Sequence, residues 1–425
     1  MQQFILGDKN SIKRNSYIWN IIGGLINAFQ SVIILIVLTR VLDIEMAGIF
    51  TIAWAIANLA ITIGKYGVRN YQVTDISEKF TFNDYLSHRI LVSVLMIIFT
   101  IVYIAFQTYT NDYSLDKIII IFLMCYLKLV DSVEDVFHGM YQQKNRLDIA
   151  GKCISVRLII STLMLCIFSI LTQNLIIASI LTCIFTTLIL FYLLKISYPI
   201  FSLPKIHISY NKSWLILKYC FPIFGGSFLS FYILNAPKYA IDALLTSELQ
   251  AYYGFISMPV FVIGLLNNFA FQPILTTMTI CYEENDIKKF ETFFWRQIIF
   301  IIFITVLALL GSFFLGIPIL SLLYNCDLSL FRLDLLILML GGGLLALVGF
   351  FTTIITLMRN QKIILIGYII VGFLALFSSN FIVYRYQLRG ASILYLFLIL
   401  ILTLFFSSFL LFRIRKWKEN IYVKE

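Results

Sequence analysis

Charged side chains gather inside an otherwise apolar stretch of the sequence, between Lys128 and His138. Lys128, Asp131 and Asp135 are spaced at i, i+3 and i+7, so a helix would place them on one face. Each charge near the centre of a bilayer costs about 2.5–3.5 kcal/mol, and it is tolerated where it faces water or an opposite charge. One interpretation is the polar wall of a cavity, in which Asp131, Glu134 and Asp135 couple transport to H⁺ or Na⁺. The other is an internally neutralised cluster near the membrane interface.

A set of basic residues within or beside apolar stretches could form a lining that attracts anions. Cations of lysine and arginine replace water around phosphate oxygens, so a diphosphate head group would suit such a lining. For Arg157, which lies one turn inside an apolar stretch, the alternative is snorkelling to the interface. The candidate substrate-binding residues are Arg40, Lys65, Arg69, Lys128, Arg157 and Lys238.

Uncharged polar residues and helix-weakening residues form two further sets. The amides of Asn27, Gln30 and Asn58 are candidates for the polar part of a cavity. Glycine and proline weaken a helix interior, and such interruptions at corresponding positions of two halves indicate a transport site. Close helix packing through small residues is the alternative. The hinge candidates are Gly23, Gly24, Pro222, Gly225 and Gly226.

No motif of a known catalytic or metal site is found in the chain. The seven cysteines are scattered through apolar segments without a CxxC pair, which excludes disulfide and zinc interpretations on spacing. A P-loop, an HExxH motif and a GxSxG motif are all missing. We therefore expect no cofactor and no metal, and we do not expect an enzyme.

The composition predicts that membrane-spanning helices position these residues. Of the 425 residues, 60% are hydrophobic and only 13% are charged, against roughly 25% charged in soluble domains. A net charge of +10 would suggest nucleic acid in a soluble protein, but the basic residues occupy short loops between apolar runs. We expect no nucleic-acid partner and an all-α membrane protein. Twelve spans are predicted: 16–39, 46–64, 90–110, 118–139, 153–171, 174–194, 214–236, 250–272, 297–320, 333–357, 363–384 and 390–412.

The order of these spans predicts two six-helix lobes around a central cavity, with residues 1–198 in the first lobe and 199–425 in the second. The basic loops fall mostly on one side, so both termini should be cytoplasmic. Similar Gly-Gly pairs in the first helix of each half indicate parallel repeats.

The chain resembles a known family at this point. The segment from Leu38 to Phe50, LTRVLDIEMAGIF, looks like the region joining the first two helices of Wzx-type polysaccharide flippases. The segment from Tyr66 to Val73, YGVRNYQV, looks like the family's pattern at the cytoplasmic end of the second helix. These flippases belong to the multidrug/oligosaccharidyl-lipid/polysaccharide exporter superfamily, and the twelve-helix layout covers the whole chain.

The resemblance implies a function that the composition does not show. Such proteins move an undecaprenyl-diphosphate-linked O-antigen or capsule repeat unit from the inner to the outer leaflet of the bacterial plasma membrane. They do so by alternating access, in which two lobes rock around a cationic cavity. The implied partners are the lipid-linked oligosaccharide, membrane lipids, a coupling ion and a polymerase of the same pathway. The alternatives are an ion-coupled drug or small-molecule antiporter of the same fold, and, less favoured, a membrane polysaccharide polymerase or glycosyltransferase.

Overall fold

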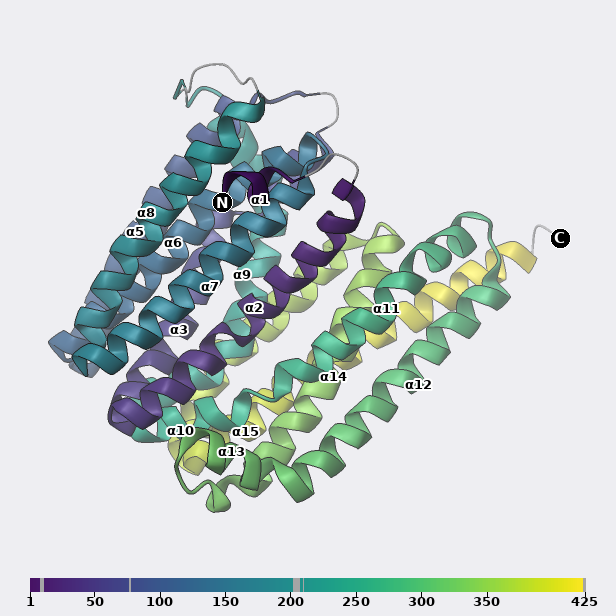
Figure 1. The fold of residues 1–425 in the computed structure, drawn as a ribbon. Helices are drawn as coiled ribbons and strands as arrows, with labels where there is room; N and C mark the ends of the chain where they lie inside the picture. The colour runs from purple at the N-terminus through teal and green to yellow at the C-terminus, as the bar shows by residue number, and fades with distance from the viewer. Residues whose placement is uncertain (8–10, 76–77, 202–206, 209, 423–425) are drawn as a thin grey trace. The chain divides into compact units, whose positions relative to one another are not determined.

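The structure, a computed structural model, describes the chain apart from residues 8–10, 76–77, 202–206, 209 and 423–425. The part described is helical throughout, without a strand (Figure 1). It divides into two compact units, Met1–Phe231 and Tyr232–Glu425. The predicted all-α class is confirmed, whereas the predicted boundary at residues 198 and 199 stays a prediction.

The first unit contains eight helices, a 3₁₀ turn and the first part of a ninth helix. They are α1 Gln2–Leu6, α2 Ile12–Val41, α3 Ile44–Lys65, α4 Val68–Thr74, α5 Phe82–Asn111, α6 Leu115–Gln143, α7 Leu147–Thr172, α8 Leu175–Ser197, η2 Tyr198–Phe201 and α9 Ser213–Leu244.

The second unit contains the end of α9 and the remaining helices. They are α10 Ser247–Ser257, α11 Val260–Glu283, α12 Ile287–Gly311, the π-helical turn η3 Ser312–Gly316, α13 Ile317–Tyr324, the 3₁₀ turn η4 Ser329–Phe331, α14 Arg332–Leu357 and α15 Gln361–Tyr422.

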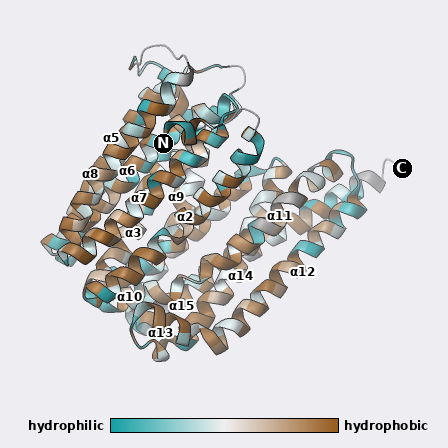
Figure 2. Ribbon diagram, in the orientation of Figure 1, coloured by the Kyte–Doolittle hydropathy of each residue, from teal (hydrophilic) through white to brown (hydrophobic). Residues whose placement is uncertain are grey.

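Ten helical segments among the described residues are long and apolar enough to cross a membrane. Apolar residues run along the length of these helices (Figure 2). Helix α6 is not among these ten segments because of its charges, and it forms an eleventh helix of similar length. Helix α15 is too long for one crossing, because 62 residues at 1.5 Å each far exceed a hydrocarbon core of about 30 Å. Gln387, with φ 50° and ψ −135°, breaks α15 into two arms. The arms fold back on each other, since a Cβ on Gly367 would meet the rings of Phe405 and Phe406. With α6 and two arms of α15, the structure gives the twelve spans that hydropathy predicts.

Several predicted spans differ from the observed helices, and three of the differences have a clear local cause. The predicted span 250–272 is two helices that meet at Pro259, the N-cap residue of α11. The predicted span 297–320 passes through the π-helical turn η3. Helix α5 begins eight residues before the predicted start at residue 90, because Thr81 and Asp84 form a reciprocal capping box there. Arg89 is therefore inside a helix and not in a loop as expected.

Helices α2 and α7 pack so closely that glycine is needed at their contact. A Cβ on Gly151 would lie 2.9 Å from Cβ of Trp19 and 3.0 Å from the backbone nitrogen of Asn20. The hydroxyl of Ser155 donates to the carbonyl of Trp19 over 3.3 Å. This contact fixes one wall of the first unit.

The substitution Gly151→Ala should lower the thermal unfolding temperature of the detergent-solubilised protein. The added methyl group meets backbone atoms of α2, and overpacking of this kind costs about 1–3 kcal/mol. The matched control is Gly349→Ala in α14, where an added Cβ meets no atom within 4 Å. That control should be neutral or stabilising by up to about 1 kcal/mol, because alanine is the better helix former. Equal shifts in the two variants would contradict the α2–α7 contact.

Candidate functional site: a charged cavity in the first unit

The first unit holds a cavity of about 210 Å³ between α2, α6 and α7, with the end of α3 and the start of α4 beside it. Each of the three long helices contributes residues at helical spacing, so each presents a single face to the cavity. The lining consists of Asn20, Gly23, Gly24 and Asn27 of α2, Asp131, Glu134, Asp135 and His138 of α6, Ala150, Ile154, Arg157 and Leu158 of α7, and Lys65 and Arg69.

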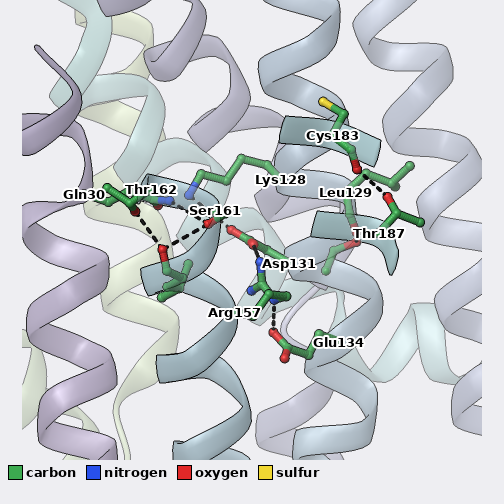
Figure 3. Close-up of polar contacts among 12 residues, drawn as sticks. Gln30, Lys128, Leu129, Asp131, Glu134, Arg157, Ser161, Thr162, Cys183 and Thr187 are labelled. Carbon is green, nitrogen blue, oxygen red and sulfur yellow. Dashed lines mark hydrogen bonds and ion pairs between the residues drawn. The ribbon is translucent and has the colours of Figure 1, made fainter. Parts of the chain in front are cut away.

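Arg157 is the centre of the charged wall. Its side chain is only 2% exposed, and it joins two carboxylates of α6: Nη1 lies 2.6 Å from Oδ1 of Asp131, and Nε lies 2.6 Å from Oε2 of Glu134 (Figure 3). His138 completes this side, with Nε2 3.4 Å from Oε1 of Glu134. Arg157 is buried and paired with these carboxylates, which favours the lining interpretation over snorkelling. An ion pair at this depth needs such close geometry, because desolvation of the two charges is expensive.

Lys128 extends the wall behind Asp131. Its ammonium lies 3.1 Å from Oδ2 of Asp131 and 4.2 Å from the centre of the Trp54 ring. A small second cavity begins here, and Gln30 lines it and donates to Ser161 over 3.4 Å. The predicted polar residue Gln30 therefore lies next to the main cavity and does not line it.

Arg89 is a buried cation of the charged wall that is not among the candidate residues from the sequence. It is 1% exposed, and its Nη2 lies 2.9 Å from Oδ2 of Asp135. Its Nη1 donates to the carbonyl of Gly64 at the end of α3. The capping box at Thr81 and Asp84 is the sequence signal that could have placed Arg89 inside a helix.

Two cations of the cavity are held loosely. Lys65 lines the cavity without a carboxylate oxygen of the described residues within 4 Å. Arg69 is 28% exposed at its side chain, lies 3.5 Å from Asp135 and donates to Oε1 of Gln142 over 3.1 Å. The cavity lining itself contains three cations, Lys65, Arg69 and Arg157, and the three carboxylates of α6. Arg89 and Lys128 lie buried behind this lining and bind the same carboxylates, so the cluster as a whole has two more basic than acidic side chains before His138 is counted.

Other predicted residues lie elsewhere. Arg40 is exposed in the last turn of α2, and Asn58 is half-buried in α3 outside both cavities. Lys238 belongs to the second unit, and its role stays a prediction. Asn27 lines the cavity and makes no hydrogen bond to another described residue.

The hinge candidates lie in helices that are continuous in the structure. Gly23 packs on α7, since a Cβ there would lie 2.9 Å from Cγ2 of Ile154, which favours the packing interpretation at this position. Gly24 and Gly226 have no atom within 4 Å of an added Cβ. Pro222 and Gly225 lie within α9, and bending at these positions stays a prediction.

The residues 14–279 match a family described as "Polysaccharide biosynthesis protein". The chain belongs to this family. Within the polysaccharide biosynthesis family, the capsular polysaccharide biosynthesis protein CapF of Staphylococcus aureus is 25% identical over 392 residues, which cover 90% of this chain and 94% of CapF.

Solved structures show the same fold at low sequence identity. The lipid II flippase MurJ in an inward closed conformation superposes with a TM-score of 0.71 at 16% identity, covering 95% of this chain and 91% of that one. An inward-facing multidrug transporter of the MATE family gives 0.68 at 14% identity, covering 92% and 96%. At these identities the two structures show that this chain shares their fold. This member of the polysaccharide biosynthesis family is a multi-pass membrane protein of a transporter fold.

Replacement of Arg157 by methionine should destabilise the protein by about 3–5 kcal/mol, because two buried carboxylates lose a partner. The double variant Arg157→Met, Glu134→Met should recover most of that loss, since Asp131 keeps Lys128. Arg415→Met removes an exposed pair with Glu419, 82% and 62% accessible, and should cost less than about 1 kcal/mol. Thermal unfolding in detergent measures all three. A single variant no weaker than the control would contradict the buried network.

Proposed function

We propose that the protein translocates an undecaprenyl-diphosphate-linked oligosaccharide repeat unit across the plasma membrane. The observation that carries this proposal is the charged cavity inside an apolar helical bundle, in which Arg89 and Lys128 behind the lining give the cluster an excess of basic side chains. Buried charge is costly, and intramembrane ionisable residues mark substrate pathways. Membership of the polysaccharide biosynthesis family and the likeness to CapF support a glycan as cargo.

The cavity suits the diphosphate better than the whole glycan. Its volume of about 210 Å³ lies below the 300–1,000 Å³ or so of pockets that enclose a drug-sized ligand. Lys65 and Arg69 can turn toward a phosphate without leaving a buried carboxylate wholly unpaired, because Asp135 keeps Arg89. Asn27 has an uncommitted amide that suits a sugar hydroxyl. The glycan then needs a wider conformation of the same cavity.

Alternating access supplies that wider conformation. In this proposal the two lobes rock, the cavity opens first to the cytoplasm and then to the outside, and the polyprenyl tail stays among the membrane lipids. Both termini are cytoplasmic in this arrangement. A polymerase of the same pathway takes the product on the outer side.

The carboxylates of α6 act in this proposal as counterions of the cationic wall. Asp131, Glu134 and Asp135 each lie within 4 Å of a basic side chain. A proton or sodium ion would have to displace one of these partners, and a bound diphosphate could do so by drawing a cation away. Coupling to an ion gradient therefore goes through exchange of partners and not through a free carboxylate.

Deletion of the gene should cause the lipid-linked repeat unit to accumulate on the cytoplasmic leaflet, with loss of surface polymer. Expression of the wild-type protein from a plasmid should restore the polymer and serves as the control. Leaflet-specific access of the glycan to a lectin or an impermeant reagent measures the accumulation. Normal surface polymer in the deletion strain would overturn the proposed function.

The substitutions Lys65→Gln and Arg69→Gln should each reduce translocation while membrane abundance stays normal, because Arg89 stays paired with Asp135 when either cation is removed. A lost charge-assisted hydrogen bond corresponds to about 1.5–3 kcal/mol, or roughly a 10- to 150-fold loss of diphosphate affinity. Arg415→Gln at the exposed end of α15 is the control for net charge. Binding of radiolabelled undecaprenyl diphosphate to the purified protein provides the measurement. Unchanged binding in both variants would contradict the cation site.

A further inference from the structure

Two consecutive residues with left-handed backbone separate α3 from α4. Tyr66 has φ 48° and Gly67 has φ 67°. This backbone is unfavourable for a residue with a side chain, so surrounding contacts must hold Tyr66 in it. The break lies directly between Lys65 and Arg69, which are the two loosely held cations of the cavity.

The side chain of Tyr66 is committed to the first part of α9. It is 8% exposed and stacks on Phe224, with the ring centroids 4.3 Å apart and the planes at 10°. Gly67 lies against Ile223, because a Cβ there would be 2.5 Å from Cγ2 of Ile223. The same short segment thus contributes to the cavity and to the docking of α9.

A second group of contacts docks the start of α9 on the region around α4. Tyr219 stacks on Tyr71 at 5.7 Å and 11°, and its hydroxyl accepts a hydrogen bond of 3.0 Å from Nζ of Lys79. Lys212, just before α9, forms a 3.1 Å ion pair with Asp84. Each of these contacts has at least one partner open to solvent and is individually weak, which is the behaviour expected of a contact that opens.

Cys220 belongs to this docked segment of α9 and is buried in its contact with the rest of the unit. It is fully buried, in one cluster with Tyr66, Val68 and Tyr85. Its thiol can be reached by a reagent only when α9 moves away from this cluster. The chain therefore carries a native reporter of α9 docking.

We propose that the Tyr66–Gly67 break couples occupancy of the cation site to release of α9. An anion that draws Lys65 and Arg69 inward rotates the segment between them, which separates Tyr66 from Phe224 and removes the contact that maintains the strained backbone. Tyr66 acts in this way as a positioning residue that never touches the substrate. The inference rests on the proposed function, because it needs an anion in the cavity.

The test uses the full-length protein in lipid vesicles and undecaprenyl diphosphate as the probe. The labelling rate of Cys220 by N-ethylmaleimide is followed by mass spectrometry of proteolytic fragments, and Cys125, buried in α6, is the internal control. We expect the probe to raise the Cys220 rate by about fivefold or more, as coupling energies of allosteric size give, and to leave the Cys125 rate unchanged. An unchanged or slower Cys220 rate with the probe bound overturns the inference.

Variants distinguish a probe-dependent release of α9 from a release that occurs without the probe. Tyr66→Ala should raise the rate without the probe and abolish the response to it, whereas Tyr66→Phe should keep both, since the stacked ring remains. Gly67→Ala should behave as Tyr66→Ala, and Gly349→Ala, free of such contacts, should behave as wild type. If Tyr66→Ala unfolds, Cys125 is labelled too, and the wild-type response decides alone. A separate assay with radiolabelled probe distinguishes the two proposals, because absent binding refutes the cation site, whereas binding without a Cys220 response refutes only the coupling.

Discussion

The guanidinium of Arg157, buried between Asp131 and Glu134, is the interaction on which the first unit depends. A charge removed from water is stable only with close partners, and both partners lie on α6 while the arginine lies on α7. The pair therefore determines the rotation of two helices about their own axes. Once those faces are set, the remaining positions at helical spacing on α6 and α7 must line the same space, which is why the cavity is polar on one side.

Close packing supplies the opposite wall. Glycine at Gly151 brings the backbone of α2 against α7, while Gly24, one position beyond the packed Gly23, leaves open space that faces the cavity. Neighbouring glycines of α2 thus serve two purposes: Gly23 allows close contact with α7, and Gly24 leaves space on the cavity side. Neither purpose requires α2 to be broken, and it is a continuous helix of 30 residues.

Hydropathy predicts the twelve spans because lipid forces every crossing into a helix, and spacing predicts that the charges of α6 share a face. The partners of those charges could not be predicted, since they depend on which faces of four helices meet. Arg89 is an example of what hydropathy alone does not predict. It lies just before an apolar run, where hydropathy predicts a loop, but the capping box at Thr81 and Asp84 starts α5 earlier and places it inside the helix. The α6 cluster lines a cavity, and its carboxylates are paired mainly with arginines of α5 and α7 and only in part with Lys128 of α6 itself. A role in ion coupling stays a prediction.

Under the proposed function, the distinction between fixed and available charge allows the site to bind and release an anion. Arg157 and Arg89 are nearly inaccessible and bound to carboxylates at 2.6 and 2.9 Å, so a substrate that took them would expose uncompensated charge in an apolar bundle. The penalty is smaller for Lys65 and Arg69, because they lie beside the turn at Tyr66 and Gly67 and Asp135 keeps Arg89 when Arg69 leaves it. Fixed cations set the field of the cavity, while mobile ones respond to what enters it. Release then needs only that the mobile pair return to the backbone conformation that stacking on α9 favours.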